Sequence, residues 1–252
     1  MQIHPTLSAH RMVWSRKAAL RRVYEDFHRR LLEACPDDPV LEVGGGSGHL
    51  KQAAARPDLI SIDILPSPWI DAVADGQRLP FADRSLGGIV MLDVLHHLPR
   101  PARFFEESAR VLRAGGRLAM IEPGITPVSG FFYRMFHQEP VDLHADPLAG
   151  PAKDTPADPF DSNQAIPTLL FTKRVHLGAF QERFPTFRLV RRDWLSLFAY
   201  PLSGGFKAWT LIPARAVGPM LRLERHLLPG LGPVMAFRLF VVLERARPPA
   251  RS

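Results

Sequence analysis

The chain has 252 residues, a net charge of +7 and a single cysteine, Cys35. Its length suits one medium domain with a substantial core, and one cysteine excludes an internal disulfide framework and favours a reducing, cytoplasmic setting. The positive residues are mostly scattered arginines without an aromatic–basic repeat, so nucleic-acid binding is not predicted. Neither a signal peptide nor an apolar run of about 18 to 20 residues is recognisable, so any membrane contact is expected to be peripheral.

Residues 1–35 are predicted to be helical, because apolar residues recur on one face and arginines on the other. The apolar residues are Trp14, Ala18, Leu20, Val23, Phe27, Leu31 and Leu32. We expect this segment to pack beside a sheet or over a ligand opening.

A strand with a glycine-rich turn is predicted at Val40–Gly48, followed by the start of a helix. Strand, tight turn and helix N-terminus form the nucleotide-binding corner of a doubly wound sheet. A dinucleotide would require the spacing G-x-G-x-x-G, whose third glycine would fall on His49. The turn therefore favours a ligand other than a dinucleotide. The alternative is a glycine-rich turn that binds no ligand.

Four further strands follow, and a helix is expected at Pro101–Leu112. These strands are Leu59–Asp63, Asp71–Asp75, Gly87–Asp93 and Gly116–Pro123. Their alternation with helices predicts a parallel sheet with right-handed crossovers. All five strands end in, or run directly into, an acidic residue, namely Glu42, Asp63, Asp75, Asp93 and Glu122. Because ligands of open α/β sheets bind at the carboxyl ends of the strands, this acidic edge favours a cationic ligand over a pyrophosphate.

Four motifs stand out between residues 40 and 122, namely Glu42-x-Gly44-x-Gly46-x-Gly48, Asp75-Gly76-x-x-Leu79-Pro80-Phe81, Leu92–Leu98 and Arg110–Gly116. In these motifs this stretch, about a third of the chain, resembles the class I S-adenosylmethionine-dependent methyltransferases, in the small-molecule branch that includes quinone methyltransferases. Many members have another residue at the position of Gly45. The resemblance implies an α/β fold with a doubly wound, Rossmann-like sheet of seven mostly parallel strands, a final antiparallel strand and an inserted cap.

The resemblance also implies S-adenosylmethionine as cofactor and ten residues that bind it. They are Glu42, Gly44, Gly46, Gly48, Asp63, Ile64, Asp75, Gly76, Leu92 and Asp93. Glu42 and the glycine backbone would hold the methionine end, Asp63 the ribose and Asp75 the adenine amino group. Ile64 and Leu92 would sandwich the adenine ring.

The loop from Asp93 to His97 would border the reacting methyl group. Methyl transfer from a sulfonium mainly requires alignment in a water-poor pocket. A hydroxyl acceptor also benefits from a base, and imidazole is matched to neutral pH. His97 is the candidate base and His96 the next, with packing at a helix start as the alternative for either. An amine or an activated carbon as acceptor would require no strong base.

The domain organisation predicted is an N-terminal helical segment (1–35), a cofactor-binding core (36–122), a proline-rich cap (123–172) and a C-terminal half of the sheet (173–252). The cap contains His137, Glu139, Asp142, His144 and Asp146. Their spacing is too loose for a metal site, so no metal is predicted. The last part is expected to contain helices Thr172–Phe184 and Ala214–Leu228 and strands Thr186–Leu197 and Ala236–Glu244. Helix 214–228 has arginines opposite its apolar side, so it either packs on its own domain or contacts a membrane surface or lipid substrate.

The predicted function is methyl transfer from S-adenosylmethionine to a small, apolar or lipid-like acceptor. Aromatic and apolar residues of the cap and the C-terminal half would line the acceptor pocket or only build the cap. They are Phe131, Phe132, Tyr133, Met135, Phe136, Trp194, Phe198, Tyr200, Phe206 and Trp209. One alternative is a non-catalytic ligand-binding domain, against which the intact Glu42, Asp63 and Asp75 argue. The other is a nicotinamide-dependent oxidoreductase, which His49 and the acidic edge disfavour.

Overall fold

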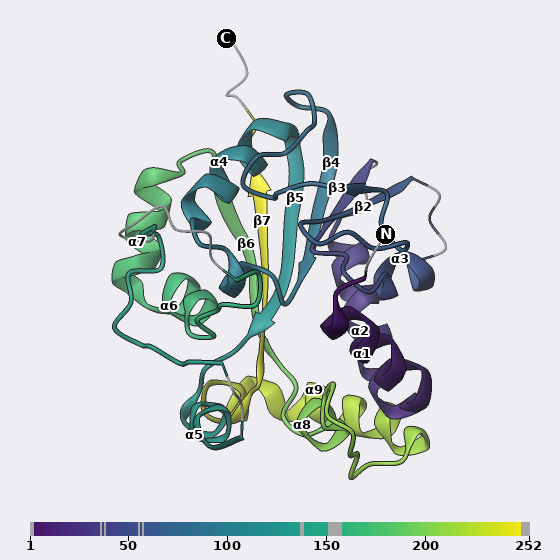
Figure 1. The fold of residues 1–252 in the computed structure, drawn as a ribbon. Coiled ribbons are helices and arrows are strands. Elements are labelled where there is room, and N and C mark those ends of the chain that lie inside the picture. The colour runs from purple at the N-terminus through teal and green to yellow at the C-terminus, as the bar shows by residue number, and fades with distance from the viewer. Residues whose placement is uncertain are drawn as a thin grey trace.

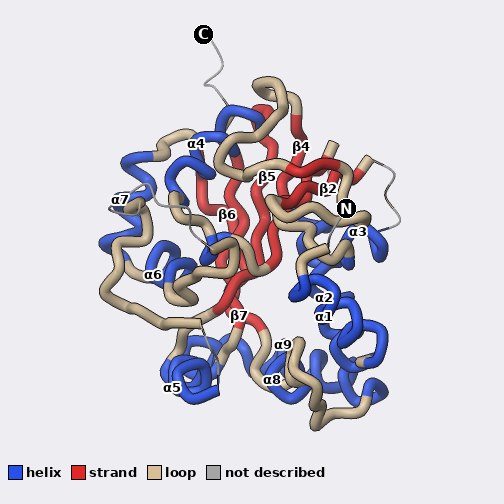
Figure 2. Tube along the Cα trace, in the orientation of Figure 1, coloured by secondary structure: helices blue, strands red, loops and turns tan. Residues whose placement is uncertain are grey.

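The computed structural model describes residues 3–35, 37, 39–54, 56, 58–136, 139–150 and 158–247. Within these residues, a twisted seven-stranded sheet runs through the molecule with helices on both faces (Figures 1 and 2). The strands are β1 (Val40–Val43), β2 (Leu59–Asp63), β3 (Ala72–Val73), β4 (Leu86–Leu92), β5 (Leu112–Pro123), β6 (Phe187–Leu195) and β7 (Arg238–Arg245). Their order in the sheet is β3-β2-β1-β4-β5-β7-β6.

The first five strands are parallel, and β7 is antiparallel to both of its neighbours, β5 and β6. This arrangement confirms the predicted α/β, Rossmann-like sheet with an antiparallel closing strand. Because β7 runs in the opposite direction, its first residue, Arg238, pairs with Pro123, the last residue of β5. β7 therefore contributes its N-terminal end to the edge at which β1 to β5 have their carboxyl ends.

Each face of the sheet carries its own hydrophobic core. Helices α4 (Pro101–Val111), α6 (Ile166–Thr172) and α7 (Arg174–Arg183) cover one face. Helices α2 (Ala18–Ala34) and α3 (His49–Ala54) cover the other, and α8 (Ala199–Ser203) and α9 (Ala214–Met235) pack against α2 and extend that core beyond the ends of the strands. Side chains alternate between the two cores along each strand, so that Ile89 and Met91 of β4 face one and Val90 the other. A parallel sheet that is covered on both faces explains why its strands are continuous apolar runs.

The N-terminal segment consists of two helices, α1 (Pro5–Arg16) and α2, separated at Lys17. The Lys17 ammonium donates to the carbonyl oxygens of Gly205 at 2.6 Å and Lys207 at 2.9 Å. This contact fixes the junction of α1 and α2 to the loop after α8, 188 residues later in the sequence.

Several helices differ from the sequence prediction. α5 (Pro127–Phe136), α6 and α8 lie in segments where no helix was predicted, and α9 continues past the predicted end at Leu228 to Met235. α9 contains Pro219, Pro229 and Pro233, so local propensity alone predicts an earlier end. Packing overrides it, since a Cβ on Gly232 would lie only 2.8 Å from Cβ of Trp194 on β6. Among the described helices, none combines the length and the hydropathy that a bilayer crossing requires.

Candidate active site

The glycine turn between β1 and α3 has the backbone conformation that its sequence predicts. Gly44, Gly46 and Gly48 have φ values of +79°, +42° and +70°. Gly45, the residue that differs from many relatives, is required for a different reason. A Cβ at this position would lie 2.0 Å from the hydroxyl oxygen of Ser61. The small residue therefore leaves room for the hydrogen bond that Ser61 makes.

The partner of Ser61 is the carboxylate of Glu42, whose Oε2 accepts from the Ser61 hydroxyl at 2.6 Å. Glu42 is buried in β1, two residues before the first glycine of the turn. Burial raises the pKa of Glu42 to about 7, although the Ser61 hydrogen bond acts in the opposite direction. Proton uptake and release by this side chain therefore fall near neutral pH.

Asp63 and Asp75 follow the next two strands in the sheet. Asp63 ends β2 and accepts from the backbone N–H of Gly46 and from that of Leu65, both at 2.8 Å. Burial raises the pKa of Asp63, and these backbone hydrogen bonds act in the opposite direction. Asp75 lies past β3 and accepts from the backbone N–H of Gln77 at 2.8 Å. Asp63 therefore joins β2 directly to the glycine turn.

The other two strand-end carboxylates, Asp93 and Glu122, are neutralised by cationic side chains. Asp93 forms an ion pair with Arg238, and Glu122 contacts the Nδ1 of His96 at 2.7 Å. Within the described residues, no comparable cation pairs with the other three, which are Glu42, Asp63 and Asp75. The predicted five-carboxylate edge is thus divided, and the negative charge that is left for a ligand lies at β1, β2 and β3.

Arg238 lies in a buried cage at the start of β7. Its guanidinium stacks over the ring of Tyr200 at 4.0 Å, while the Tyr24 hydroxyl lies 3.5 Å from Oδ2 of Asp93. Tyr133 of α5 donates a hydrogen bond to the carbonyl oxygen of Phe237 at 3.0 Å. The three tyrosines are the only ones in the sequence, and all three have electrostatic contact with Arg238. Together they form an aromatic wall, with the Asp93 carboxylate beside it, at the carboxyl end of β4.

The sequence patterns considered above do not indicate Arg238 or the convergence of the tyrosines. A signal was available, since Arg238 stands between Phe237 and Leu239 in an otherwise apolar strand. A buried arginine requires a carboxylate or an equivalent partner. The identity of that partner depends on the antiparallel register of β7 against β5.

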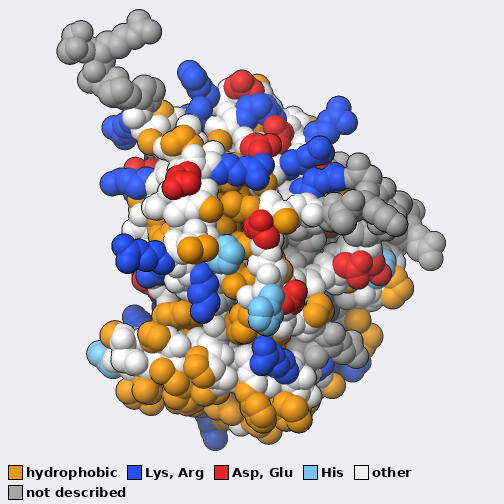
Figure 3. Space-filling model, turned by 90° about the vertical axis from the view of Figure 1, so that its left-hand side faces the viewer, with side chains coloured by type: hydrophobic (Ala, Val, Ile, Leu, Met, Phe, Trp, Pro, Cys, Tyr) orange, Lys and Arg blue, Asp and Glu red, His pale blue; other side chains and the backbone are white. Residues whose placement is uncertain are grey.

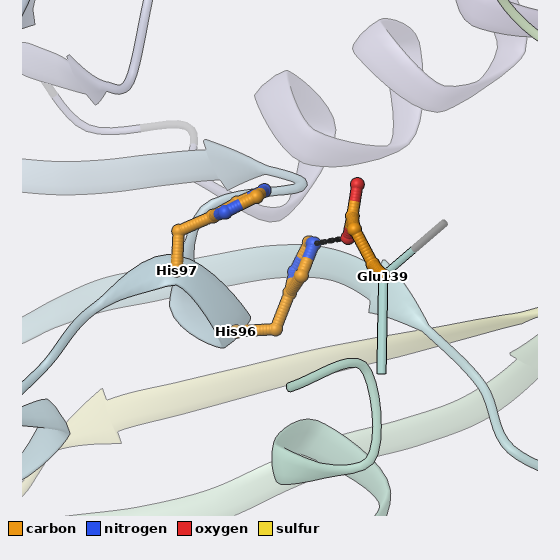
Figure 4. A group of neighbouring side chains, drawn as sticks. All are labelled: His96, His97 and Glu139. Atoms are coloured by element: carbon orange, nitrogen blue, oxygen red, sulfur yellow. Dashed lines mark ion pairs between the residues drawn. The ribbon is translucent and has the colours of Figure 1, made fainter. Parts of the chain in front are cut away.

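His96 lies between two carboxylates and is buried. Its Nδ1 contacts Glu122, and its Nε2 lies 3.5 Å from Oε2 of Glu139 in the cap (Figure 4). Burial alone would lower the pKa of His96, but the two carboxylates outweigh it and raise the pKa to about 9. His96 is therefore a charged imidazolium at neutral pH, and it cannot accept a further proton.

His97, the predicted base, lies beside His96 with a ring-centroid distance of 4.2 Å (Figure 4). Its Nδ1 is 3.2 Å from the carbonyl oxygen of Asp161. Since a carbonyl oxygen only accepts, Nδ1 carries the proton in this contact and Nε2 keeps its lone pair. Burial and the positive charge of His96 lower the pKa of His97. Of the two histidines, His97 is the one in the protonation state that a base requires.

The ligand-type atoms of His96, His97 and Glu139 lie within 4.8 Å of one another. A metal ion there would compete with the proton between His96 and Glu139, and the absence of a metal stays a prediction. Of the residues weighed earlier for a metal site, His137 lies outside the described residues. The His144 side chain is exposed and lies 3.6 Å from Asp142.

The structure separates the aromatic residues that were predicted to line the acceptor pocket. Tyr133 and Tyr200 lie in the Arg238 cage, and Phe132 packs against Phe237. Phe131, Met135 and Phe136 are 66, 62 and 60 % exposed, so neither expected role, lining a pocket or building the core of the cap, is seen for these three residues. The residues proposed to sandwich adenine lie after β2 and at the end of β4, with β1 between them. Ile64 is 54 % exposed, and Leu92 is partly buried.

Helix α1 lies directly against the glycine turn. Arg11 donates to the carbonyl oxygen of Ser47 at 2.7 Å, and its guanidinium stacks 4.4 Å from the ring of Trp69. A Cβ on Gly46 would lie 3.3 Å from Leu7 of α1. His49, which stands where a dinucleotide site would have glycine, is buried and stacks on Trp14 with a ring distance of 3.9 Å. α1 therefore packs directly on the glycine turn.

Comparisons with known proteins agree with this geometry. A family profile described as "Methyltransferase domain" matches residues 41–120. The chain is 28% identical over 156 residues to a probable S-adenosylmethionine-dependent methyltransferase of Mycobacterium tuberculosis, which covers 57% of this chain and 49% of that protein. It is 32% identical over 110 residues to a probable phthiotriol/phenolphthiotriol dimycocerosates methyltransferase of Mycobacterium ulcerans, covering 37% and 43%. The chain thus spans less than half the length of these two curated relatives.

Among solved structures, the fold is similar to that of geranyl diphosphate C-methyltransferase from Streptomyces coelicolor. The TM-score is 0.52 at 13% identity, and the match covers 89% of this chain and 80% of that one. At this identity the similarity concerns the fold alone. The glycine turn and the profile match agree over the same stretch: residues 41–120 match a methyltransferase domain and are similar to S-adenosylmethionine-dependent methyltransferases.

Proposed function

We propose that this protein transfers a methyl group from S-adenosylmethionine to a small, largely apolar acceptor of lipid-like character. The observation that carries the proposal is the division of the strand-end carboxylates. Glu42 and Asp63 lie beside the glycine turn and Asp75 follows β3, and none of the three forms an ion pair with a cationic side chain among the described residues. A ligand with a sulfonium and an ammonium group supplies the missing positive charge, whereas a pyrophosphate would add to the repulsion.

The residues around the turn suit this ligand in position as well as in charge. Glu42 lies below the glycines, where it would hold the ammonium group. Asp63 would accept from the ribose hydroxyls, and Asp75 would bind the adenine amino group. The bound cofactor supplies an activated methyl group on a good leaving group. Alignment of the acceptor and exclusion of water are then the main tasks of the protein.

The acceptor site is assigned to the space beside the Arg238 cage. Asp93 and His97 border it from the loop after β4, and Tyr24, Tyr133 and Tyr200 form its wall. His97 holds an unprotonated Nε2 that can take a proton from a hydroxyl acceptor. The ion pair with Arg238 holds the Asp93 carboxylate in place. A wall of aromatic rings with few polar groups is typical of pockets for apolar small molecules.

Support for a lipid-like acceptor comes from the relatives. One curated relative is named as a methyltransferase of phthiotriol dimycocerosates, and another, from Mycobacterium leprae, carries a similar name at 31% identity. The match with the first of these covers only 43% of that protein. The acceptor class is therefore proposed from two observations together, the similarity to these relatives and the wall of tyrosines.

Calorimetry on the purified protein tests the cofactor assignment. We expect binding of S-adenosylmethionine and of its demethylated product, S-adenosylhomocysteine, and no binding of NAD. Heat from NAD without heat from S-adenosylhomocysteine would refute the assignment. For the acceptor, protein and isotopically methyl-labelled cofactor are incubated with a lipid extract and with the water-soluble fraction of the same lysate. Mass spectrometry should find the labelled product in the lipid extract.

A further inference from the structure

One end of the molecule carries an unusually apolar surface. Helices α5, α8 and α9 lie together beyond the ends of the strands, and α5 contacts α9 (Figure 1). Hydrophobic side chains gather along this end in the space-filling view (Figure 3). The large exposed hydrophobic residues of α5, α9 and the loop before α9 are Val128, Phe131, Met135, Phe136, Trp209, Leu211, Leu223, Leu231 and Val234. Exposed apolar surface of this kind marks an interaction site.

The exposed and buried residues of α5 lie on opposite faces of the helix. Val128, Phe131 and Met135 follow the spacing i, i+3, i+7 and are exposed. Ser129 and Tyr133, on the other face, are buried, and Tyr133 bonds to the backbone of Phe237 beside the Arg238 cage. α5 thus separates the proposed acceptor site from the apolar surface by the width of one helix.

The same end of the molecule has no exposed acidic residue on these elements. The chain contains 25 acidic residues, yet residues 123–136 and 195–235 together contain only Glu224. Glu224 is buried, and its Oε1 accepts from the backbone N–H groups of Phe198 and Ala199, both at 2.6 Å. The exposed charged residues of the two segments are all basic, namely Arg134, Lys207, Arg215, Arg222 and Arg225.

Apolar side chains among exposed cations, with no carboxylate between them, complement an anionic lipid surface. A second copy of the chain is a poorer partner, because a symmetric contact would bring like-charged arginines together. We propose that α5 and α9 dock this protein on an anionic lipid bilayer, with Phe131, Met135 and Phe136 inserted among the lipids and the arginines against their phosphates. The inference deepens the proposed function, since it places the source of a lipid-like acceptor next to the acceptor site.

Vesicle flotation tests the surface with two compositions, phosphatidylcholine alone and phosphatidylcholine with phosphatidylglycerol. The full chain should float only with the anionic vesicles at about 0.1 M salt, and binding should weaken at higher salt because the charges are then screened. Phe131→Ser/Met135→Ser should lose binding at least about tenfold through lost apolar contact. Arg222→Gln/Arg225→Gln should lose on the order of thirtyfold, since each arginine near the surface contributes about fivefold.

Matched controls come from α7, which covers the face of the sheet opposite to the one on which α9 packs. Val175 is 77 % exposed, and Val175→Ser should float like the wild type. The charge control is Lys173→Gln/Arg174→Gln, two exposed basic residues before and at the start of α7. Equal loss in these controls would refute the location of the surface. Unchanged melting temperatures show that all the variants are folded.

Three other outcomes overturn the proposal. They are no flotation with anionic vesicles, equal flotation with both compositions, and a concentration-dependent dimer that Phe131→Ser/Met135→Ser abolishes. Binding of S-adenosylhomocysteine, measured without vesicles, tests the proposed function independently of membrane binding. A protein that binds the nucleoside but does not float keeps its methyltransferase assignment and loses the membrane surface.

Discussion

Arg238, the first residue of β7, forms an ion pair with Asp93, which follows β4 and lies 145 residues earlier in the chain. The two strands are separated in the sheet by β5. Asp93 has a φ of +59°, a left-handed conformation that few residues other than glycine adopt. The ion pair therefore fixes the loop after β4, with its strained residue Asp93, to the start of β7.

Arg238→Met should destabilise the fold by about 3 to 5 kcal/mol, because it leaves the Asp93 carboxylate without its partner. The double variant Arg238→Met/Asp93→Leu should recover part of this loss. Denaturant unfolding measures both free energies. The matched control is Arg188→Met, which breaks an ion pair with Glu244 whose arginine side chain is 70 % exposed. It should cost less than about 1 kcal/mol. Equal losses at the two arginines would contradict a special role for the buried pair.

S-adenosylhomocysteine should bind more tightly as the pH rises through 7. The Glu42 carboxyl, with its pKa raised to about 7 by burial, must be ionised to hold an ammonium group. Below pH 7 the affinity should fall by up to about tenfold per pH unit, since one proton has to be released. Calorimetry in buffers of different ionisation enthalpy measures how many protons are released when S-adenosylhomocysteine binds. Glu42→Gln should bind more weakly and without this pH dependence, and a pH-dependent Glu42→Gln protein would remove Glu42 from the site.

Asp63→Ala should weaken binding of the nucleoside by about 1.5 to 3 kcal/mol, through the loss of charge-assisted ribose hydrogen bonds. The substitution also removes the acceptor of the Gly46 N–H group, so the turn should loosen. Asp58→Ala is the control, because Asp58 lies at the start of β2, away from the turn, and pairs with Arg56. An unchanged dissociation constant in Asp63→Ala would exclude Asp63 from cofactor binding.

His97→Ala should slow methyl transfer to a hydroxyl acceptor by about 10² to 10⁴, the usual contribution of a general base. Binding of S-adenosylhomocysteine should not change. In the wild type, burial and His96 lower the pKa of His97, so the rate should stay level from pH 8 down to about 6.5 and fall only below it. His176→Ala on α7 is the control. A rate that is insensitive to His97 would indicate an acceptor that needs no base.

His96 should make the stability depend on pH in the alkaline range. Its folded pKa of about 9 lies above the unfolded value of 6.5, so the stabilisation is complete below pH 6.5 and lost as the pH rises through 9. The loss should be on the order of 3 kcal/mol, from about 1.4 kcal/mol per pKa unit. Denaturant unfolding of wild type and His96→Gln at pH 6.5 and 9.5 isolates the effect. Parallel pH profiles of the two proteins would show that His96 is not the responsible group.

The core between Val40 and Pro123 could be predicted closely from sequence. β2 has the predicted boundaries, and α4 and the strands next to it end within a few residues of those expected. Here the local signals agree with each other, since buried strands are continuous apolar runs and the helix begins with Pro101, where proline is tolerated. The glycine turn could be placed because its positive φ values restrict the choice of residue.

The cap and the acceptor side could not be predicted in the same way. The many prolines of the cap predict no helix there, although Pro127 at the first position of α5 starts one. Once α5 is known to be a helix, its period of about 3.6 residues places Tyr133 on the buried face and Phe131 on the exposed face. The difference between His96 and His97 likewise depends on Glu122 and Glu139, which the sequence does not place beside either ring. These contacts are set by tertiary packing alone.

The gathering of every tyrosine of the chain in one cage has a spectroscopic consequence. Tyr24, Tyr133 and Tyr200 are buried, and burial raises the pKa of each above its ordinary value of 10. The native protein should therefore show almost no tyrosinate absorbance at pH values where an exposed phenol is already ionised. In an alkaline titration, the appearance of that absorbance reports the opening of the acceptor side rather than the titration of surface groups. The tyrosinate absorbance of the wild-type protein can therefore be used to follow that region, and no label has to be introduced.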